Sequence, residues 1–532
     1  MPLPHPDTRP PAPALACFGT GSDVGKSVLA AALCRIIRRQ GFRPAPYKAQ
    51  NMSNNSGITP EGKEMGRAQI TQAEACGIPP HVDMNPVLLK PATDIGAQVV
   101  LMGEAGAHVA ASDYHQKKNL YWKTAAGALD RLRAAYDAVI IEGAGSCAEV
   151  NLMAHDIVNF RVAEYADAPV LLIADIHRGG VFAQIVGTLE CLPPARRDRV
   201  AGFLINRFRG DISLFSDGVK WIEQKTGKPV FGVIPWFSDF HIASEDSVVL
   251  EQGTADHLPP PGASDEKPVV AVIRLPHIAN FTDLDPLHGV EGLTVHLLSA
   301  PRDLSPYAAV ILPGSKNTRH DLDWLMESGW GSRLRRYAAP DITGGHVLGV
   351  CGGYQMMGRL VHDPDGLEGP PGTTEGLGLL PVETRLRAPK TTTRTVFDWE
   401  GIAGEGYEIH MGQTDQNGGT PLLAVHTRNG KTPRSGNAGP DAADGCRDAS
   451  GRILGTYIHG FFDTPPILYH WLRQIGLGHL HADPAGGLPA RQRALDQLAD
   501  HMERHADTAA LLSLLDMGRN GSTAAPDRSH LP

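Results

Sequence analysis

Short apolar runs alternate with longer amphipathic stretches over the first 240 residues of the chain. The runs are bounded by Gly, Asp, Asn or Pro, which is typical of buried parallel strands. Five runs are expected to be strands: ALACFG (14–19), AVIIEGAG (138–145), PVLLIAD (169–175), VAGFLIN (200–206) and PVFGVIP (229–235). KSVLAAALCRIIRRQG (26–41) and VFAQIVGTLECL (181–192) have apolar residues at helical spacing. This alternation predicts a doubly wound α/β domain with a parallel sheet.

A second alternating pattern begins near residue 269 and predicts another α/β domain. Its expected strands are VVAVIRLP (269–276), LTVHLLSA (293–300), AAVILPGS (308–315), HVLGVCGG (346–353), GLGLLPVE (376–383) and ILGTYIHG (453–460). The pattern ends near 475 with an expected helix, PPILYHWLRQIG (465–476). The polar, Pro- and Gly-rich stretch 251–268 separates the two patterns and is the best linker candidate.

These patterns divide the chain into five parts. Residues 1–13 are Pro-rich and polar, so we expect a disordered tail with no export signal. Residues 14–250 form the first domain, 251–268 the linker and 269–475 the second domain. Residues 476–532 are expected to be a helical C-terminal extension with a disordered end, because RQRALDQLADHMERH and AALLSLLDM are amphipathic.

Composition narrows the classes of protein that fit. The 532 residues are 42% hydrophobic, and Lys+Arg 49 against Asp+Glu 58 gives a net charge of -9. This acidic balance argues against nucleic acid or an anionic membrane as a partner. None of the apolar runs approaches the roughly 20 residues of a membrane-spanning helix. Seven cysteines without a C-x-x-C pair indicate neither a zinc site nor a disulfide framework, so we expect a cytoplasmic protein.

The stretch GTGSDVGKS (19–27) lies between an expected strand and an expected helix. The pattern G-x-x-x-x-G-K-[ST] needs a glycine where Thr20 stands, and the glycines fall at 19 and 21 instead. Lysine and serine still lie at a helix start, where backbone N–H groups bind phosphate, and an ordinary turn would leave them unexplained. We therefore expect ATP to bind at Gly19, Thr20, Gly21, Ser22, Asp23, Val24, Gly25, Lys26 and Ser27.

An ATP site of this kind needs Mg²⁺, which prefers a hydroxyl and a carboxylate at the carboxyl edge of a parallel sheet. Ser27 supplies the hydroxyl, and Glu142 follows a buried strand and precedes glycines. An N-cap or loop acid is the alternative role for Glu142. Lys48, at the end of another expected strand, would neutralise the γ-phosphate or a carboxylate substrate.

LGVCGGYQMMG (348–358) indicates a strand, a sharp turn carrying Cys351 and then a helix, whose N-terminus favours a thiolate. The N–H of Gly352 and the turn at Gly314 are expected to form an oxyanion hole. His459, at the end of an expected strand, is the candidate base. The alternative for Cys351 is a small buried residue in a tight turn. His277, His320 and His362 have no such context.

Several stretches resemble known families. GTGSDVGKS resembles the loop of dethiobiotin synthetase, which activates a carboxylate with ATP. The stretches that resemble the cobyric acid synthases are KAQNMSNNS (48–56), LLKPATDIGAQVV (88–100), EGAGSCAEVNL (142–152), ADIHRGGVFAQ (174–184) and LINRFRGD (204–211). Two positions depart from that family: His177 stands where we expect aspartate, and Cys147 where proline is usual.

The second domain resembles the class I glutamine amidotransferases, in which a cysteine attacks the glutamine amide and ammonia leaves. Many relatives have Glu two residues after the histidine, where this chain has Phe461. The chain is therefore similar to the cobyrinate-type subgroup, which works as a Cys–His pair, and we do not assign Asp463 as a third member. GYEIHMG (406–412) is also typical of that subgroup and is expected to shape the pocket or the domain contact. The family pattern makes His459, not His410, the base.

The resemblance implies a complete reaction. ATP would phosphorylate a carboxylate, and ammonia from L-glutamine would attack the acyl phosphate. The implied corrinoid substrate is adenosylcobyrinic acid a,c-diamide, amidated at its b, d, e and g carboxylates. Three alternatives stay open: cobyrinic acid a,c-diamide synthase, a related glutamine-dependent amidase of another carboxylate substrate, and a non-enzymatic nucleotide switch or partitioning ATPase with a decayed amidotransferase module. The corrinoid contacts and the oligomeric state are not predicted.

Overall fold

A computed structural model of the protein describes residues 10–93, 96–237, 256, 258, 267–341, 344–432, 442–481 and 486–515. Residues 1–9, nearly all of the expected linker 251–268, and the end from 516 lie outside the described residues. Ala12, within the expected disordered tail, is buried, and its N–H donates to the carbonyl of Arg133 at 2.8 Å. The described chain is thus ordered before the first strand begins.

A six-stranded sheet in the order β12-β11-β10-β1-β9-β2 forms the centre of the N-terminal half. Every neighbouring pair in it is parallel, and the five predicted strands all belong to it. The bounds are β1 Ala14–Gly19, β2 Pro44–Tyr47, β9 Ala138–Glu142, β10 Val170–Asp175, β11 Val200–Phe208 and β12 Val230–Pro235. The inner strands β1, β9 and β10 are buried along their whole length, which explains their continuous apolar runs. The doubly wound α/β prediction is confirmed.

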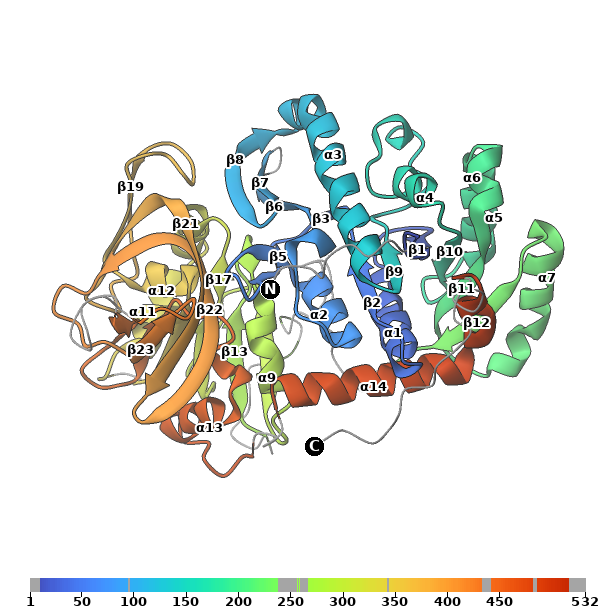
Figure 1. The fold of residues 1–532 in the computed structure, drawn as a ribbon. Coiled ribbons are helices and arrows are strands. Elements are labelled where there is room, and N and C mark those ends of the chain that lie inside the picture. The colour runs from blue at the N-terminus through green and yellow to red at the C-terminus, as the bar shows by residue number, and fades with distance from the viewer. Residues whose placement is uncertain are drawn as a thin grey trace, which may run out of the picture.

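Helices cover this sheet, as Figure 1 shows. Their bounds are α1 Lys26–Arg39, α2 Arg67–Cys76, α3 Ala111–Ala135, α4 Phe160–Ala166, α5 Val181–Cys191, α6 Pro194–Arg199 and α7 Ser216–Thr226. A smaller sheet in the order β3-β6-β7-β8 lies beside them. Its strands are β3 Gln50–Met52, β6 Val87–Thr93, β7 Gly96–Leu101 and β8 Glu104–Ala110, and the hairpin β4 Ser56–Ile58 with β5 Glu64–Gly66 follows β3.

The C-terminal half has its own sheet in the order β15-β13-β16-β18-β26-β25. The first five strands are parallel and β25 is antiparallel. The bounds are β13 Val269–Ile273, β15 Thr294–Leu298, β16 Ala309–Leu312, β18 His346–Val350, β25 Cys446–Arg447 and β26 Ile453–Thr456. Its helices are α9 Asp285–His288, α10 Thr318–Glu327, α11 Trp330–Ala338, α12 Gly352–Met357 and α13 Pro465–Gln474. The predicted second α/β pattern is confirmed at five of its six runs.

The sixth run, 376–383, is not a parallel strand, and that prediction is wrong. Its residues are irregular until β21 begins at Glu383. β21 Glu383–Trp399 and β22 Ile402–Asp415 are long antiparallel strands in a separate sheet with β19 Leu360–Asp363, β20 Gly372–Glu375, β23 Leu423–Arg428 and β24 Ala443–Asp444. The apolar residues of the run, including Leu377 and Leu380, pack into the domain core without ladder pairing.

Buried polar contacts join the two halves. The β4 segment meets a turn of the C-terminal half, where the N–H of Ser56 donates to Asn280 Oδ1 at 3.0 Å. Beside it, Glu64 is fully buried and binds Lys90 at 2.7 Å and Lys390, from β21, at 2.8 Å. We call the Glu64, Lys90 and Lys390 group the seam cluster. These ion pairs hold β5 and β6 of the N-terminal half against β21 of the C-terminal half.

The C-terminal extension returns to the N-terminal half instead of staying with the domain it follows. Its helices are α14 Leu488–His505 and α15 Thr508–Ser513, and α14 lies along the N-terminal half beneath α1 (Figure 1). Arg35 of α1 donates to both carboxylate oxygens of Asp496 at 2.8 and 2.7 Å. Arg491 bridges Glu74 of the first half and Asp463 of the second, at 3.1 and 3.2 Å. The extension therefore ties both halves together.

Among the described residues, no helix combines the length and apolar character that a membrane crossing requires.

Replacing Asp496 with Ala should loosen α14. Arg35 is largely buried and would keep only Gln492 as its partner on α14, so we expect the opening of this helix to cost about 1–2 kcal/mol less. Hydrogen–deuterium exchange of residues 488–505 measures this free energy. Asp500→Ala is the matched control, because its carboxylate is exposed and contacts only the side chain of Arg39. Equal protection of α14 in both variants would contradict the docking role of Asp496.

Candidate active sites

The loop between β1 and α1 has an unusual backbone conformation. Asp23 and Gly25 have left-handed φ angles of 56° and 96°. A Cβ on Gly25 would lie 2.1 Å from Asn206 Nδ2, so only glycine fits there. The same Nδ2 donates to the carbonyl of Val24 at 2.9 Å. The end of β11 thus holds the loop in its tight form.

The two predicted phosphate-site side chains lie at the start of α1. Lys26 Nζ donates to the carbonyls of Gly21 at 2.9 Å and Gly145 at 3.0 Å. Its side chain therefore connects the loop 19–27 to the segment that follows β9. Ser27 Oγ donates to Glu142 Oε1 at 2.7 Å. A helix N-terminus, a lysine, a hydroxyl and a carboxylate therefore meet at one edge of the sheet, as an ATP–metal site requires.

The other loop side chains contact two of the motifs quoted above. Asp23 binds Arg207 at 2.9 Å and Arg178 at 3.0 Å, so 174–184 and 204–211 both meet the loop. Thr20 Oγ1 donates to Gln184 Oε1 at 3.3 Å. Ser22 Oγ lies beside Gly145. These side chains hold the loop, and its backbone carries the phosphate-binding capacity.

Glu142 is the centre of a buried polar network. Lys48 Nζ donates to Oε1 at 2.9 Å, while Gln72 Nε2 at 2.6 Å and Gln69 Nε2 at 3.3 Å donate to Oε2. Burial by itself raises the pKa of Glu142, but Lys48 and the hydrogen bonds bring the pKa below its ordinary value. The carboxylate is therefore ionised. Neither glutamine was predicted to belong to the site, because polar residues on a helix usually face solvent.

Cys351 occupies a strained turn between β18 and α12. Its φ and ψ are 52° and -107°, a backbone conformation that non-glycine residues rarely adopt. Its N–H donates to the carbonyl of Thr456 at 2.8 Å, and its thiol lies 3.6 Å from the carbonyl of Ile409. Strain of this kind presents a nucleophile at the tip of a strand-to-helix elbow.

His459 is 1% exposed and lines the same cavity as Cys351. Its Nδ1 lies 2.7 Å from Asp283 Oδ2, and the N–H of Gly460 donates to Asp283 Oδ1 at 2.8 Å. Asp283 belongs to the short 3₁₀ helix η4 Phe281–Leu284. The predicted Cys–His pair therefore has a third, orienting carboxylate that the sequence analysis missed, while Asp463 binds Arg491 instead.

Asp283 also changes the charge of the base. Burial lowers the pKa of His459, but Asp283 and then Cys351 outweigh it and raise the pKa from 6.5 to about 10. Imidazolium is therefore retained in the folded protein well above neutral pH. An imidazolium at this position can donate a proton to the leaving ammonia.

The two turns predicted for the oxyanion hole meet at this cysteine. Gly314 lines the same cavity as Cys351 and His459. β17 Gly314–Ser315 pairs antiparallel with β14 Ile278–Ala279, which fixes the turn. A Cβ on Gly352 would lie 2.7 Å from the Ser315 nitrogen, so the two turns approach without room for a side chain.

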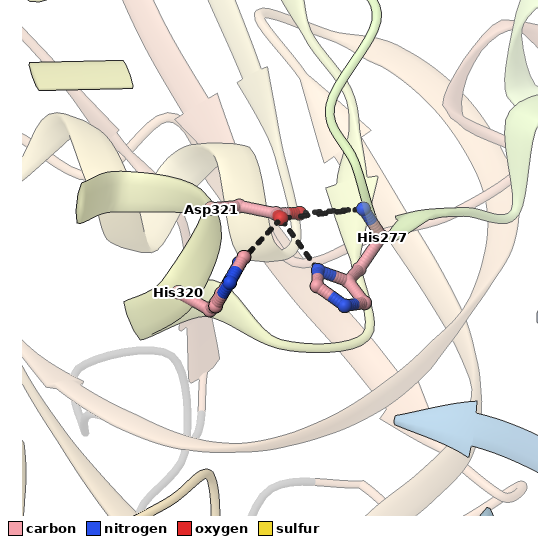
Figure 2. A group of neighbouring side chains, drawn as sticks. All are labelled: His277, His320 and Asp321. Atoms are coloured by element: carbon pink, nitrogen blue, oxygen red, sulfur yellow. Dashed lines mark hydrogen bonds and ion pairs between the residues drawn. The ribbon is translucent and has the colours of Figure 1, made fainter. Parts of the chain in front are cut away.

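Asp321 supports the turn at Ser315. Figure 2 shows it between His277 and His320, with His277 Nδ1 2.7 Å and His320 Nδ1 3.8 Å from Oδ1. Ser315 Oγ donates to Asp321 Oδ2 at 2.6 Å. The three ligand atoms lie within 4.8 Å of one another, but His277 and Ser315 already satisfy the carboxylate. We assign this group to holding the Gly314 turn, not to a metal.

The GYEIHMG stretch contributes to both the pocket and the domain contact. Tyr407 stacks on His459 with ring centroids 5.3 Å apart, and its hydroxyl donates to the carbonyl of Ser56 at 3.1 Å. His410 lines the cavity, but its Nε2 lies 3.2 Å from Glu408 Oε2. The expectation for this stretch is confirmed, and the contacts of His410 differ from those of a base.

Two family models match the chain. Residues 15–249 match the CobQ/CobB/MinD/ParA nucleotide binding domain, and residues 269–467 match the CobB/CobQ-like glutamine amidotransferase domain. Curated cobyric acid synthases are similar over nearly the whole chain. The protein from Chlorobium phaeobacteroides is 49% identical, covering 94% of this chain and 97% of its own. The protein from Chlorobaculum tepidum is 48% identical, covering 95% and 99%.

The chain belongs to the cobyric acid synthase family.

Family membership identifies the chain as a glutamine-dependent amidating ligase with a nucleotide-binding domain. The two departures from the family pattern have local explanations. Cys147 contacts the phosphate loop through its backbone, since its N–H donates to the carbonyl of Gly19 at 3.0 Å. His177 packs on Trp236 with ring centroids 4.9 Å apart.

Asp283→Asn should slow glutamine hydrolysis by about 10²-fold, because the imidazole loses its orienting carboxylate. Since Asp283 raises the pKa of His459, its loss should lower that pKa and move the alkaline limb of the kcat/KM profile for glutamine to lower pH. The profile is measured as glutamate release from pH 6 to 10.5.

Asp463→Asn is the control, because that residue also lies near His459 but binds Arg491. An unshifted alkaline limb in Asp283→Asn would contradict the proposed link between Asp283 and His459.

Proposed function

We propose that the chain converts adenosylcobyrinic acid a,c-diamide to adenosylcobyric acid by amidating the b, d, e and g carboxylates, with ATP and L-glutamine as co-substrates. The observation that carries the proposal is the pairing of two built sites in one chain that is 49% identical to a cobyric acid synthase over 94% of its length. One site has the groups for phosphoryl transfer, and the other has those for release of ammonia.

In the glutaminase site, the Cys351 sulfur attacks the amide carbon of glutamine. His459 holds the thiol proton and passes it to the leaving ammonia, while Asp283 keeps the imidazole oriented. The N–H groups at Gly352 and the Gly314 turn stabilise the oxyanion. Water then hydrolyses the thioester, glutamate leaves and the thiol is restored.

In the synthetase site, a substrate carboxylate oxygen attacks the γ-phosphorus of ATP and ADP leaves, giving an acyl phosphate. The loop 19–27 binds the phosphates through its N–H groups and Lys26. Lys48 lies on Glu142 in this structure, at 2.9 Å. We propose that Lys48 transfers to the γ-phosphate or the substrate carboxylate when these anions bind. Ammonia then attacks the acyl carbon and phosphate leaves.

The donor set beside the loop fits Mg²⁺. Ser27 Oγ and Glu142 Oε1 are hydrogen-bonded to each other, so both oxygens face one position, and both are hard ligands. Ser27 and Glu142 would hold the ion. When bound, Mg²⁺ neutralises the charge that develops on the phosphates. Gln72 and Gln69 orient the carboxylate from the opposite side.

Ammonia must reach the acyl phosphate without passing through bulk water, where it would be protonated. The glutaminase cavity contains Lys90, a residue of the N-terminal half, together with Cys351. The cavity therefore reaches the seam between the halves. We propose that ammonia crosses the molecule at this seam.

Glu142→Gln should reduce amide formation from ammonium chloride by at least about 10²-fold and raise the Mg²⁺ concentration needed, because a neutral amide is a poor ligand for the ion. Titration of the synthesis rate with Mg²⁺ measures both effects. Glu149→Gln is the control, since Glu149 is an exposed acid of the same loop. A normal Mg²⁺ titration in Glu142→Gln would remove Glu142 from the metal site.

Mass spectrometry of the product tests the function directly. With adenosylcobyrinic acid a,c-diamide, ATP and glutamine, four amides should be added. No reaction with this substrate, and two added amides on cobyrinic acid, would favour the a,c-diamide synthase. Turnover of ATP without any amide product would favour a nucleotide switch.

Variants of the two sites separate the half-reactions. Cys351→Ala should lose synthesis from glutamine and keep synthesis from ammonium chloride. Lys26→Ala should lose both. Loss of both activities in Cys351→Ala would contradict separate sites, and product from Lys26→Ala would contradict the ATP assignment.

A further inference from the structure

The cavity at Cys351 extends beyond the groups that the reaction uses. Its wall includes Lys316 and Glu368, two opposite charges with no role in the chemistry at the amide. Thr318 and Gln355 lie on the same wall and are tied together, because Thr318 Oγ1 donates to Gln355 Oε1 at 2.9 Å. The wall of the cavity therefore carries polar and charged groups in addition to those at the amide.

Lys316 directly follows the Gly314–Ser315 strand, so the oxyanion turn sets its position. Its N–H donates to the carbonyl of His277 at 2.9 Å. In the described part of the chain, the Lys316 ammonium forms no ion pair. Burial, followed by the charges of Lys390 and Lys90, holds its pKa below the ordinary value. An anion bound here would therefore be stabilised by an ammonium that lacks a counterion.

Glu368 lies in the loop between β19 and β20. The N–H of Arg319 donates to its Oε2 at 3.1 Å, and the N–H of Glu368 donates to Asp363 Oδ2 at 2.8 Å, so the side chain is anchored at both ends. Burial raises its pKa. The charge of Lys316 opposes this rise, although the two side chains form no ion pair with each other. A cation bound here would meet a carboxylate that accepts from the Arg319 N–H and has no ion-pair partner among the described residues.

The neighbouring charges form the seam cluster. Glu64 binds both Lys90 and Lys390, at 2.7 and 2.8 Å. One carboxylate therefore serves two ammonium groups, so the cluster keeps a net positive charge beside the cavity, and Lys316 and Glu368 line the cavity without forming an ion pair. Opposite charges that line a cavity without forming an ion pair suit a ligand that supplies the complementary charges. A zwitterion supplies both charges in one molecule.

We propose that Glu368 binds the α-ammonium and Lys316 the α-carboxylate of glutamine, with the side-chain amide at Cys351. This inference rests on the proposed glutaminase reaction and makes the two residues determinants of specificity. The amide carbon is then placed by two anchors at the other end of the substrate. Asparagine, shorter by one methylene, cannot meet both anchors and Cys351 at once.

The test removes each charge from the protein and from the substrate. The variants are Glu368→Gln and Lys316→Met, and the substrates are glutamine, 4-carbamoylbutanoate (without the α-ammonium) and 4-aminobutanamide (without the α-carboxylate). Each variant should raise KM for glutamine by about 10- to 100-fold with kcat little changed, because a charged hydrogen bond is lost in ground state and transition state alike.

The decisive comparison tests each variant on the analogue that lacks the charge which the mutated residue would bind. On 4-carbamoylbutanoate, Glu368→Gln should have a kcat/KM within about twofold of the wild type. This analogue has no α-ammonium, so it does not make the contact that the substitution removes. Lys316→Met should match the wild type on 4-aminobutanamide. An equal loss on glutamine and on the matching analogue would overturn the proposal, as would an unchanged KM for glutamine.

Two controls separate this inference from the function itself. Glu375→Gln removes an exposed carboxylate from the adjacent strand β20 and should leave KM for glutamine unchanged. Synthesis from ammonium chloride reports that each variant is folded. If the wild type hydrolyses no glutamine, the proposed function fails; if it does and the variants do not match the wild type on these analogues, only the anchors fail.

Discussion

The seam cluster is the contact on which both sites depend. A fully buried carboxylate, Glu64, is compensated by one lysine from each half of the molecule, and all three side chains are at most 7% exposed. Burying these charges is costly unless every partner is present. The lysine from β21 therefore joins an ion pair that the N-terminal half already forms, and it obtains its carboxylate partner only when the halves are docked. When the two halves are docked, every charged group of this cluster has an ion-pair partner.

The same docking completes the glutaminase pocket. Lys90 is part of the seam cluster and also lines the cavity of Cys351, so a residue of the nucleotide-binding half contributes to the amidotransferase site. Asp283 is placed in a similar way. Its neighbour Thr282 donates to Asn55 Oδ1 at 3.3 Å, across the domain contact. The orientation of His459 is thus tied to the position of the other half.

One short segment touches both chemistries. Residues 48–56 begin at Lys48, which binds Glu142 of the ATP site, and end at Ser56, which binds Asn280 beside Asp283. Nine extended residues span at most about 30 Å, so the two sites are linked by a chain too short to absorb large independent motions. The segment 48–56 therefore joins the ATP site to the domain contact beside Asp283.

What the sequence determined by itself was local. Apolar runs predicted the central strands, since a strand buried on both faces must be apolar throughout, and glycine turns before helices placed Lys26 and Cys351. The run 376–383 was wrongly predicted to be a strand, because a loop buried in the core is as apolar as a strand. Tertiary structure alone decided what depends on distant segments: Asp283 lies 176 residues from His459, Lys390 lies 326 from Glu64, and the extension returns to α1. Single polar residues carry no periodic signal, and only folding shows which of them meet.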